Sequence, residues 1–516
     1  MRSALITFIF SFITLFATAQ DSLVYYQELS FSSELEEKAF SDFFLHGQQN
    51  YLELFMATSP LSTTGNYNVA NQKIETEINS IDKEKLFKKK PEKRVKALYD
   101  QIHADFLSKY ELQNNFTEIF TNGNYNCVSA SALYSLFFES FEIPYAIKES
   151  PTHVYVIAYP KSARILVEST DPGGKFIVFD DRYKSDFVNR MKSAKLISEA
   201  EYNSKTVSQL FDQYYFSEEE IGLKELVGIQ YSNEALYKLE KENYLGAYED
   251  LKKSYLLYPS KKVSSMLMMV NSILLSRADY YDSTAVQQLN QLSRFKEYGF
   301  TNDDMLAEFG RLTNDILINH TDFDRYAQAY VTLTPSFKDE ELRKEVDFVF
   351  NYENGRILYN RHKYSEALSY LEKAYNLKSD NANIEELLVA NIIQQTRSQS
   401  NNIATIAFLE KRKETHPALT DNISFKSLLT VSYLVESGNS FDLNRIQDGL
   451  KYMHMFEEQY SKDLSIDTEY IGRFYAIAAT YYFKKGNTSK AKQTIEKGLE
   501  YAPGHHELLI RKRMIR

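Results

Sequence analysis

Tryptophan is absent from the chain, and cysteine occurs only once, at Cys127, among 516 residues. A single cysteine cannot form a disulfide within its own chain, so Cys127 is either a small buried residue or a reactive thiol. Glycine (17 residues) and proline (10 residues) are also scarce, which favours helices over sandwiches and barrels. These absences predict a largely helical protein whose fold does not depend on oxidation.

Long apolar runs and basic stretches are missing as well. Beyond the N-terminus no run approaches the roughly 18 apolar residues that a membrane helix needs. The net charge of −10, without a long basic stripe, argues against nucleic-acid binding. The histidines show no metal-ligand spacing, and no phosphate-binding glycine loop or dinucleotide motif occurs. We therefore expect no nucleic-acid partner, no cofactor and no metal, while the oligomeric state stays unknown.

The N-terminus has the pattern of a secretory signal peptide. Arg2 supplies a positive charge, Ala4 to Phe16 is apolar, and Ala17 to Ala19 has the small-x-small form of a cleavage site. The apolar stretch is short for a membrane span, although an uncleaved anchor is the alternative interpretation. We expect residues 1–20 to be removed and the mature chain to be exported, periplasmic or secreted, with no membrane span.

The sequence pattern changes near residue 220. Residues 21–220 mix helical and strand patterns, whereas residues 221–516 read almost entirely as helices in pairs. Near the end of the chain Ala479, Ala491 and Pro503 follow one another at intervals of twelve positions. This spacing resembles the tetratricopeptide repeat, in which small side chains let two paired helices approach closely.

The same repeat frame recurs earlier in residues 221–516, although its residues are not always twelve positions apart. The recurrences are Ala235, Ala247 and Pro259, then Gly355, Ala367 and Ala374, and a weaker one at Thr405, Leu409 and Pro417. One repeat cannot bury its apolar face alone, so the pattern predicts a continuous all-α solenoid of the tetratricopeptide type. Such a solenoid either binds a protein or peptide or only supports the N-terminal domain, and the sequence leaves both uses open.

The surroundings of Cys127 suit a nucleophile. Asn126 is a good N-cap, and an apolar helical pattern follows from Val128 to Phe141. The N-terminal end of a helix favours the thiolate, which is the form of cysteine that attacks. Two strands are predicted next, Val154–Tyr159 and Arg164–Ser169. A helix followed by antiparallel strands gives an α+β N-terminal domain.

A histidine and two acids complete the candidate site. His153 begins the first predicted strand, where it can hold the proton of a thiol, and a carboxylate can orient its ring. A two-residue hairpin loop places Glu168 opposite His153, and a three-residue loop places Asp171 there. We prefer Glu168, because Asp171 precedes Pro172 and has the pattern of a turn former. The predicted catalytic residues are Cys127, His153 and Glu168, with Asp171 as the alternative acid.

The order of these motifs resembles the transglutaminase-like branch of the papain-like cysteine enzymes. The resemblance covers about Lys93 to Gly174. Its motifs are Cys127 at a helix start, Ile143-Pro144 after the helix, Thr152-His153-Val154 at a strand start, and Val167-Glu168-Ser169-Thr170, where the family usually has aspartate. The resemblance implies a transglutaminase-like fold and a thiol enzyme that acts on amide bonds.

The missing tryptophan bears on the reaction that this resemblance implies. Animal-type transglutaminases have a tryptophan near the oxyanion, and this chain has none. Hydrolysis of an amide or peptide bond is therefore expected rather than protein cross-linking. The oxyanion donors would be backbone N–H groups or the side chain of Asn122, Asn124 or Tyr125.

Two functions follow for the whole chain. The first is an exported cysteine-dependent hydrolase, either an amidase or a peptidase, whose repeats bind a protein or peptide; acyl transfer is also open. The second is a non-catalytic protein-binding scaffold with a degenerate transglutaminase-like domain, in which Cys127 is an inert, buried helix residue. Both functions imply a protein or peptide partner.

Overall fold

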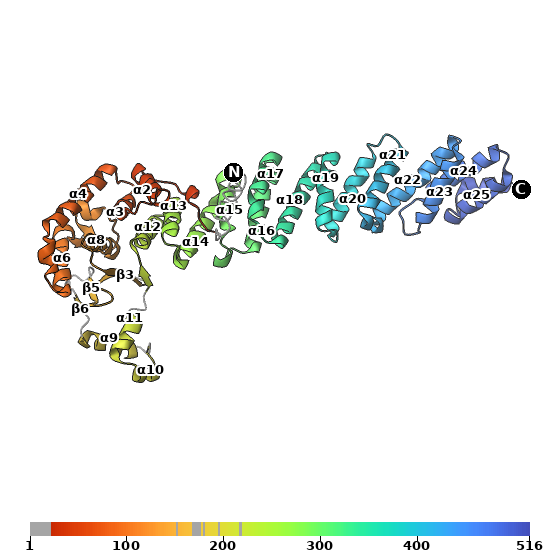
Figure 1. The fold of residues 1–516 in the computed structure, drawn as a ribbon. Coiled ribbons are helices and arrows are strands. Elements are labelled where there is room, and N and C mark those ends of the chain that lie inside the picture. The colour runs from red at the N-terminus through yellow and green to blue at the C-terminus, as the bar shows by residue number, and fades with distance from the viewer. Residues whose placement is uncertain are drawn as a thin grey trace, which may run out of the picture. The chain divides into compact units, whose positions relative to one another are not determined.

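The computed structural model describes residues 22–150, 153–167, 177–178, 181–193, 197–215 and 219–515. The predicted signal peptide lies outside these residues. The chain divides into two compact units (Figure 1). Unit 1 runs to Asp279 and also contains Gln287–Phe300, and unit 2 consists of Tyr280–Val286 and the residues from Thr301 onward.

Unit 1 begins with short and medium-length helices that precede the candidate site. They are α2 (Glu34–Phe44), α3 (Tyr51–Ala57), α4 (Thr64–Ser80), α5 (Lys83–Phe87), α6 (Pro91–Phe106) and α7 (Glu118–Thr121). Between them, β1 (Lys109–Tyr110) and β2 (Asn124–Tyr125) form a short parallel pair. Strand β2 leads directly into the helix that carries Cys127.

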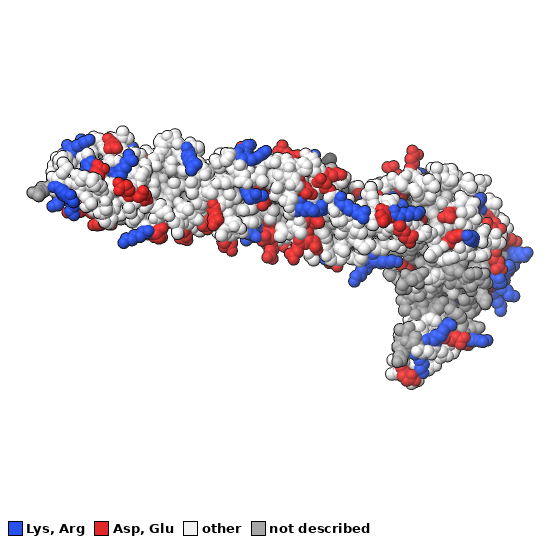
Figure 2. Space-filling view, turned by 180° about the vertical axis from the view of Figure 1, so that it is seen from behind, with Lys and Arg blue, Asp and Glu red and all other residues white. Residues whose placement is uncertain are grey.

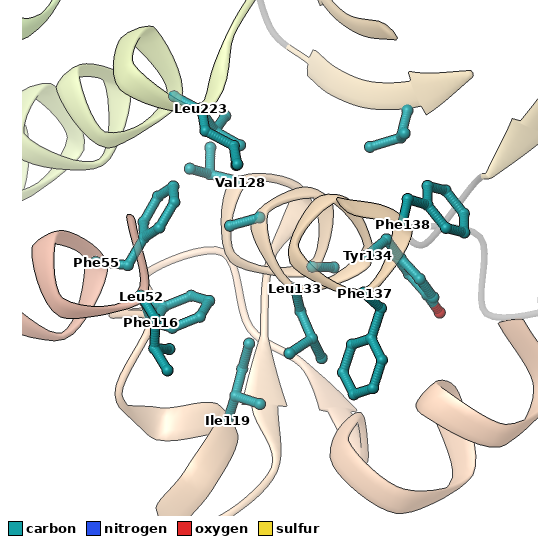
Figure 3. Close-up of a cluster of buried hydrophobic side chains, with 14 of the residues drawn as sticks. Leu52, Phe55, Phe116, Ile119, Val128, Leu133, Tyr134, Phe137, Phe138 and Leu223 are labelled. Atoms are coloured by element: carbon teal, nitrogen blue, oxygen red, sulfur yellow. The ribbon is translucent and has the colours of Figure 1, made fainter. Parts of the chain in front are cut away.

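Helix α8 (Cys127–Ser140) forms the centre of unit 1. Leu133, Tyr134, Phe137 and Phe138 on this helix are all fully buried, and Figure 3 shows them on α8 within a cluster that also takes in side chains of other elements, such as Phe55 and Phe116. A helix that is apolar on every side belongs inside a core and not at its surface. The core that α8 organises therefore fixes the position of the helix start, where Cys127 lies.

An antiparallel sheet packs against α8. Its strands run in the order β6 (Ile177–Val178), β5 (Ile165–Val167), β4 (His153–Ala158), β3 (Tyr145–Ser150) and β7 (Glu219–Ile221). Strand β4 alternates between two buried clusters: Val154, Val156 and Ala158 join the core around α8, and Tyr155 and Ile157 join a second cluster. The second cluster includes residues of α9 (Asp181–Ser193) and α11 (Val207–Tyr215), and α10 (Glu199–Ser204) lies between these helices in sequence. The expected mixture of helix and antiparallel sheet is thus present in unit 1.

The register of the β4–β5 hairpin differs from both predicted registers. The predicted two-residue loop would pair Val156 with Ile165. The predicted three-residue loop would pair Val156 with Glu168. In the structure Val156 pairs with Val167, and Ala158 pairs with Ile165. The reason is the connection, which is longer than either predicted loop and begins and ends with residues at positive φ, Tyr159 (53°) and Arg164 (47°).

From Leu223 to Met514 every regular element is helical, which agrees with the predicted all-α region. The first helix pair of this region, α12 (Leu223–Glu240) and α13 (Tyr244–Leu257), belongs to unit 1. A buried ion pair between Lys253 of α13 and Glu36 of α2, 2.7 Å long, links the pair to the helices at the start of the chain. Helices α14 (Lys261–Arg277) and α15 (Ser283–Leu292) follow.

Unit 2 is a stack of helices that follow one another along the chain (Figure 1). They are α16 (Asn302–Leu312), the π-helix η4 (Thr313–Asn319), α17 (Phe323–Leu333), α18 (Glu340–Asn360), α19 (Tyr364–Leu377), α20 (Ala382–Thr396), α21 (Asn402–Thr415), α22 (Ile423–Asp442), α23 (Ile446–Gln459), α24 (Thr468–Lys484), α25 (Thr488–Tyr501) and α26 (His506–Met514). The segments between the clear repeats are helical too, as the continuous solenoid requires.

The small residues of the repeat pattern lie at the contacts between paired helices. Ala479 of α24 and Ala491 of α25 are both buried. A Cβ atom added at Gly355 of α18 would come within 2.5 Å of Leu371 on α19, so only glycine allows this approach. These contacts confirm the predicted role of the small residues, and unit 2 is a solenoid of tetratricopeptide-like helix pairs. None of the described helices is long and apolar enough to cross a membrane.

Candidate functional site

Asn126 positions Cys127 at the start of α8. The side-chain oxygen of Asn126 accepts hydrogen bonds from the backbone N–H groups of Val128 (3.0 Å) and Ser129 (3.0 Å). In return, the Ser129 hydroxyl accepts a bond from the Asn126 N–H group (2.9 Å). This reciprocal cap confirms the predicted N-cap. Cys127 is consequently the first residue of the helix, half-buried, with a free thiol.

The loop that contains Leu112 and Asn114 holds the cap from the other side. The amide of Asn126 donates to the carbonyl oxygens of Leu112 (3.2 Å) and Asn114 (3.4 Å). The Ser129 hydroxyl donates to the side-chain oxygen of Asn114 (2.7 Å). Because Asn114, Asn126 and Ser129 are all buried, the two bonds that involve Asn114 are shielded from water, and they hold the start of α8 in place.

Helix α12 supplies residues that contact the loop beside the start of α8, and the sequence alone does not indicate them. The Tyr237 hydroxyl donates to the Leu112 carbonyl (2.9 Å). Burial raises the pKa of Tyr237 to about 12, and the nearby Cys127 adds to that rise. Gln230 donates to the Asn114 carbonyl (3.1 Å) and to Glu234 (2.9 Å). These residues lie about a hundred positions after Cys127 within a repeat-like helix, so no local motif marks them.

The second predicted site residue, His153, begins β4. It is half-buried, and its ring stacks against that of Tyr155, with centroids 5.8 Å apart. The Ser131 hydroxyl, one turn after Cys127, donates to the carbonyl of Val154 (3.4 Å). The first turns of α8 and the start of β4 are therefore in contact, while side-chain alternation directs His153 to the face of Tyr155 and Val154 to the face of α8.

Of the predicted acids and oxyanion donors, the structure describes only the donors. Glu168 and Asp171 lie outside the described residues. Asn122 accepts a bond from the backbone of Asn124 (2.9 Å), and Asn124 donates to Glu118 (3.4 Å). Tyr125 is buried, and burial raises the pKa of its hydroxyl. The two asparagine side chains thus bond within the turn around β2, and the catalytic assignment of Cys127, His153 and Glu168 stays a prediction.

A second candidate site is a hollow of about 540 Å³ in unit 2. It is lined by Tyr281, His320, Thr321, Asp322, Phe323, Asp324, Leu358, Lys363, Glu366 and Tyr370. The rings of Tyr281 and His320 stack with centroids 4.1 Å apart. The hollow therefore combines aromatic surface with charged groups of both signs, a composition that is common in protein interfaces.

Local backbone features accompany this hollow. His320 directly follows the π-helix Thr313–Asn319, and Thr321 has a positive φ of 54°. A π-helix is rare and often occurs at functional sites. Asp322 then caps α17 by accepting a bond from the Arg325 N–H group (3.0 Å). Among the residues that the structure describes, no three His, Cys, Asp or Glu side chains gather as a metal site.

Comparisons with known proteins give structural neighbours only. No protein-family model matches the chain, and no curated protein matches it. The tetratricopeptide-repeat domain of P58(IPK) is similar at 13% identity, over 65% of this chain and 87% of that chain, with a TM-score of 0.19. Naa15/Naa10 bound to HypK-THB is similar at 11% identity, over 57% of each chain, with a TM-score of 0.17. The assignment of unit 2 as a solenoid rests on its own helix packing, and the resemblance of the N-terminal region to transglutaminase-like enzymes stays a prediction.

Proposed function

We propose that the chain is a protein-binding scaffold and that its partner contacts unit 2. The observation that carries the proposal is the series of paired helices whose small residues, Ala479, Ala491 and Gly355 among them, make close contacts. A solenoid of this kind exposes a long surface relative to its core, and such surfaces bind proteins or peptides. The hollow beside Tyr370 is the part of that surface with the side chains best suited to a partner.

Photo-crosslinking in cells tests this proposal with the full chain. A photoreactive phenylalanine replaces Phe323 or Tyr370, which are half-buried in the hollow. The control replaces Leu61 of unit 1, whose side chain is 87% exposed. We expect a discrete adduct with another protein from both positions in the hollow and none from position 61. Absence of an adduct at Phe323 and Tyr370 would contradict the proposal.

A thiol hydrolase is the second candidate function. It is supported by the capped position of Cys127 at a helix start and by the contact between the first turns of α8 and the start of β4. The scaffold is placed first because the close contacts between the paired helices of unit 2 support it. In this second function Cys127 would attack an amide carbonyl, with His153 as its base.

Iodoacetamide labelling of the native chain distinguishes the two functions. A catalytic thiol is labelled faster than a model thiol near neutral pH, and His153→Ala removes that difference. An inert thiol at a half-buried position is labelled more slowly than the model thiol, and His153→Ala changes nothing. The first result supports the hydrolase, and the second leaves the scaffold as the function of the chain.

A further inference from the structure

A compact group of lysines lies at the turn between α5 and α6 in unit 1. The group, called the lysine patch below, consists of Lys85, Lys88, Lys89, Lys90 and Lys93, and all five side chains are exposed. Within the part of the chain that the structure describes, none of the five forms an ion pair or a side-chain hydrogen bond. Figure 2 shows Lys and Arg side chains gathered at the right edge of the view, on the side of unit 1 where Figure 1 labels α6.

Buried residues on both sides of the turn fix the direction of these lysines. Leu86 of α5 and Val95 of α6 are buried in the core of unit 1. Pro91 is the first residue of α6, a position where proline starts a helix and separates it from the segment before. Each helix is anchored by its apolar face, so the lysines between the two anchors lie on the solvent side.

Arg94 holds the backbone of the turn in place. Its guanidinium donates to the carbonyl oxygens of Phe87 (2.9 Å) and Lys89 (3.1 Å), and it lies 4.2 Å from the centroid of the Phe87 ring. The Lys83 ammonium donates to the carbonyl of Ser140 at the end of α8 (3.0 Å). These two basic side chains build the turn, whereas the lysine patch stays available to a partner outside the chain.

The chemistry of the patch distinguishes between kinds of anionic partner. Lysine is a compact point charge that suits any dense negative surface, whereas the planar fork of arginine recognises single carboxylates and phosphates. The arginine of this turn, Arg94, is occupied by backbone carbonyls. Phe87 lies among the lysines, and its side chain is 42% exposed. Lysines around an exposed aromatic ring are the composition with which a protein surface attaches to anionic lipid.

We infer that the lysine patch binds the surface of an anionic lipid membrane. The ammonium groups of Lys88, Lys89 and Lys90 would lie at the level of the lipid phosphates, and the Phe87 ring would enter the boundary between headgroups and acyl chains. Each lysine near an anionic surface strengthens binding about fivefold, so the patch gives a reversible attachment that salt weakens. The inference concerns a surface other than the hollow beside Tyr370 and does not depend on the scaffold proposed above.

Two other anionic partners fit the observations less well. A nucleic acid also attracts lysines, but proteins bind it along a groove or stripe that follows the strand, and the lysine patch occupies a single turn. An acidic protein segment would pair its carboxylates with the lysines. A stable protein interface, however, buries more apolar surface than the one exposed ring of Phe87 offers.

Sedimentation with lipid vesicles tests the inference. The chain is purified without its predicted signal peptide, residues 1–20, because that apolar segment would itself enter lipid. One set of vesicles contains equal parts of phosphatidylcholine and phosphatidylglycerol, and a matched set contains phosphatidylcholine alone. We expect the chain to sediment with the anionic vesicles and not with the neutral ones, and the bound fraction to fall as NaCl is added. Lys88→Glu combined with Lys89→Glu should weaken the binding at least about tenfold.

The control combines Lys261→Glu with Lys262→Glu at the start of α14, where both side chains are also exposed. It changes the net charge by the same amount and should bind anionic vesicles as the wild type does. Circular dichroism verifies that each variant is folded, and Lys88→Gln with Lys89→Gln replaces the first variant if its spectrum differs. No binding to the anionic vesicles, equal binding to both kinds of vesicle, or equal weakening by the two double variants would overturn the inference.

Soluble polyanions test the alternative partners. Binding of polyglutamate or of a DNA duplex through Lys88 and Lys89, without binding to vesicles, would assign the lysine patch to an acidic polymer and would also overturn the inference. The crosslinking expected from Tyr370 does not involve this patch. If the adduct at Tyr370 forms while vesicle binding is absent, the proposed scaffold stands and only the inference fails.

Discussion

Asn126 is the residue that determines where the only thiol of the chain lies. It caps α8 with its side-chain oxygen and binds the loop at Leu112 with its amide. An N-cap asparagine that is also buried contributes more than an exposed one, because its loss leaves backbone groups without partners away from water. The position of Cys127 is thus set by its neighbour and not by the cysteine itself.

Replacing Asn126 by alanine should therefore destabilise unit 1. We expect Asn126→Ala to lower the free energy of unfolding by about 2 kcal/mol, since it removes the cap and leaves buried N–H groups unpaired. Urea denaturation followed by circular dichroism measures the change. Asn122→Ala, which removes one exposed hydrogen bond within the same turn, is the control and should lower the free energy by only about 0.5 kcal/mol. Equal effects of the two variants would show that the cap is not decisive.

Glu28 makes the stability of the chain depend on pH. Burial alone would raise the pKa of Glu28, but two hydrogen bonds from Arg294 (2.7 and 2.9 Å), a bond from the Tyr25 N–H group and the charge of Arg294 outweigh it and lower the pKa. A carboxyl whose pKa is lower in the folded state stabilises the fold above its unfolded pKa. That contribution disappears as the pH falls through the folded pKa.

Comparison of Glu28→Gln with the wild type across pH measures this contribution. Near pH 7 the variant should be less stable by about 1 kcal/mol, because a neutral amide forms weaker bonds to Arg294. The difference should shrink as the pH falls below about 4, the ordinary range of a glutamate pKa. Glu37→Gln, at an exposed position of α2, should show no such dependence. A difference that stays constant with pH would refute the role of the Glu28 carboxylate.

At the scale of elements, helix pairs depend on glycines at their contacts. A Cβ atom at Gly498 of α25 would lie 2.6 Å from Cβ of Tyr475 on α24 and 2.9 Å from Leu508 on α26. At Gly310 of α16 an added Cβ atom would meet nothing within 4 Å. The two positions are both helical, so they separate the effect of the contact from the effect of helix propensity.

The same substitution should have opposite signs at these two glycines. Gly310→Ala should stabilise unit 2 by about 0.5 to 1 kcal/mol, because alanine loses less backbone entropy in a helix. Gly498→Ala should destabilise it by about 1 to 3 kcal/mol, because the methyl group forces the paired helices apart. Thermal unfolding of both variants measures the signs. Stabilisation by both substitutions would contradict the close packing of α24 against α25.

The sequence predicts such helix pairs better than it predicts the hairpin. Helical periodicity and the twelve-residue spacing of small residues act locally, so the helices and the contact at Ala479 and Ala491 follow from the sequence. The register of β4 and β5 depends on the loop that joins them. Tyr159 and Arg164 in that loop have positive φ values, which tyrosine and arginine rarely adopt, so the sequence gives no sign of them. For this reason neither predicted register matches the observed pairs.

At the scale of the whole molecule, the neighbours of Cys127 could not be predicted. Tyr237 and Gln230 reach the loop beside it from α12, a helix with the periodicity of a repeat. Asn126 and the helix start were predictable, because caps act over a few residues. The partners from α12 depend on how the first helix pair packs against the rest of unit 1, which no pattern within either segment encodes.

The central claim is that the chain acts by binding a partner through unit 2 and not through the thiol of Cys127. The most direct test compares photo-crosslinking from position 370 in the full wild-type chain and in Cys127→Ser. We predict the same adduct in the same yield for both, since serine is close in size to cysteine and retains the helix start. Loss of the adduct in a folded Cys127→Ser chain would contradict the claim.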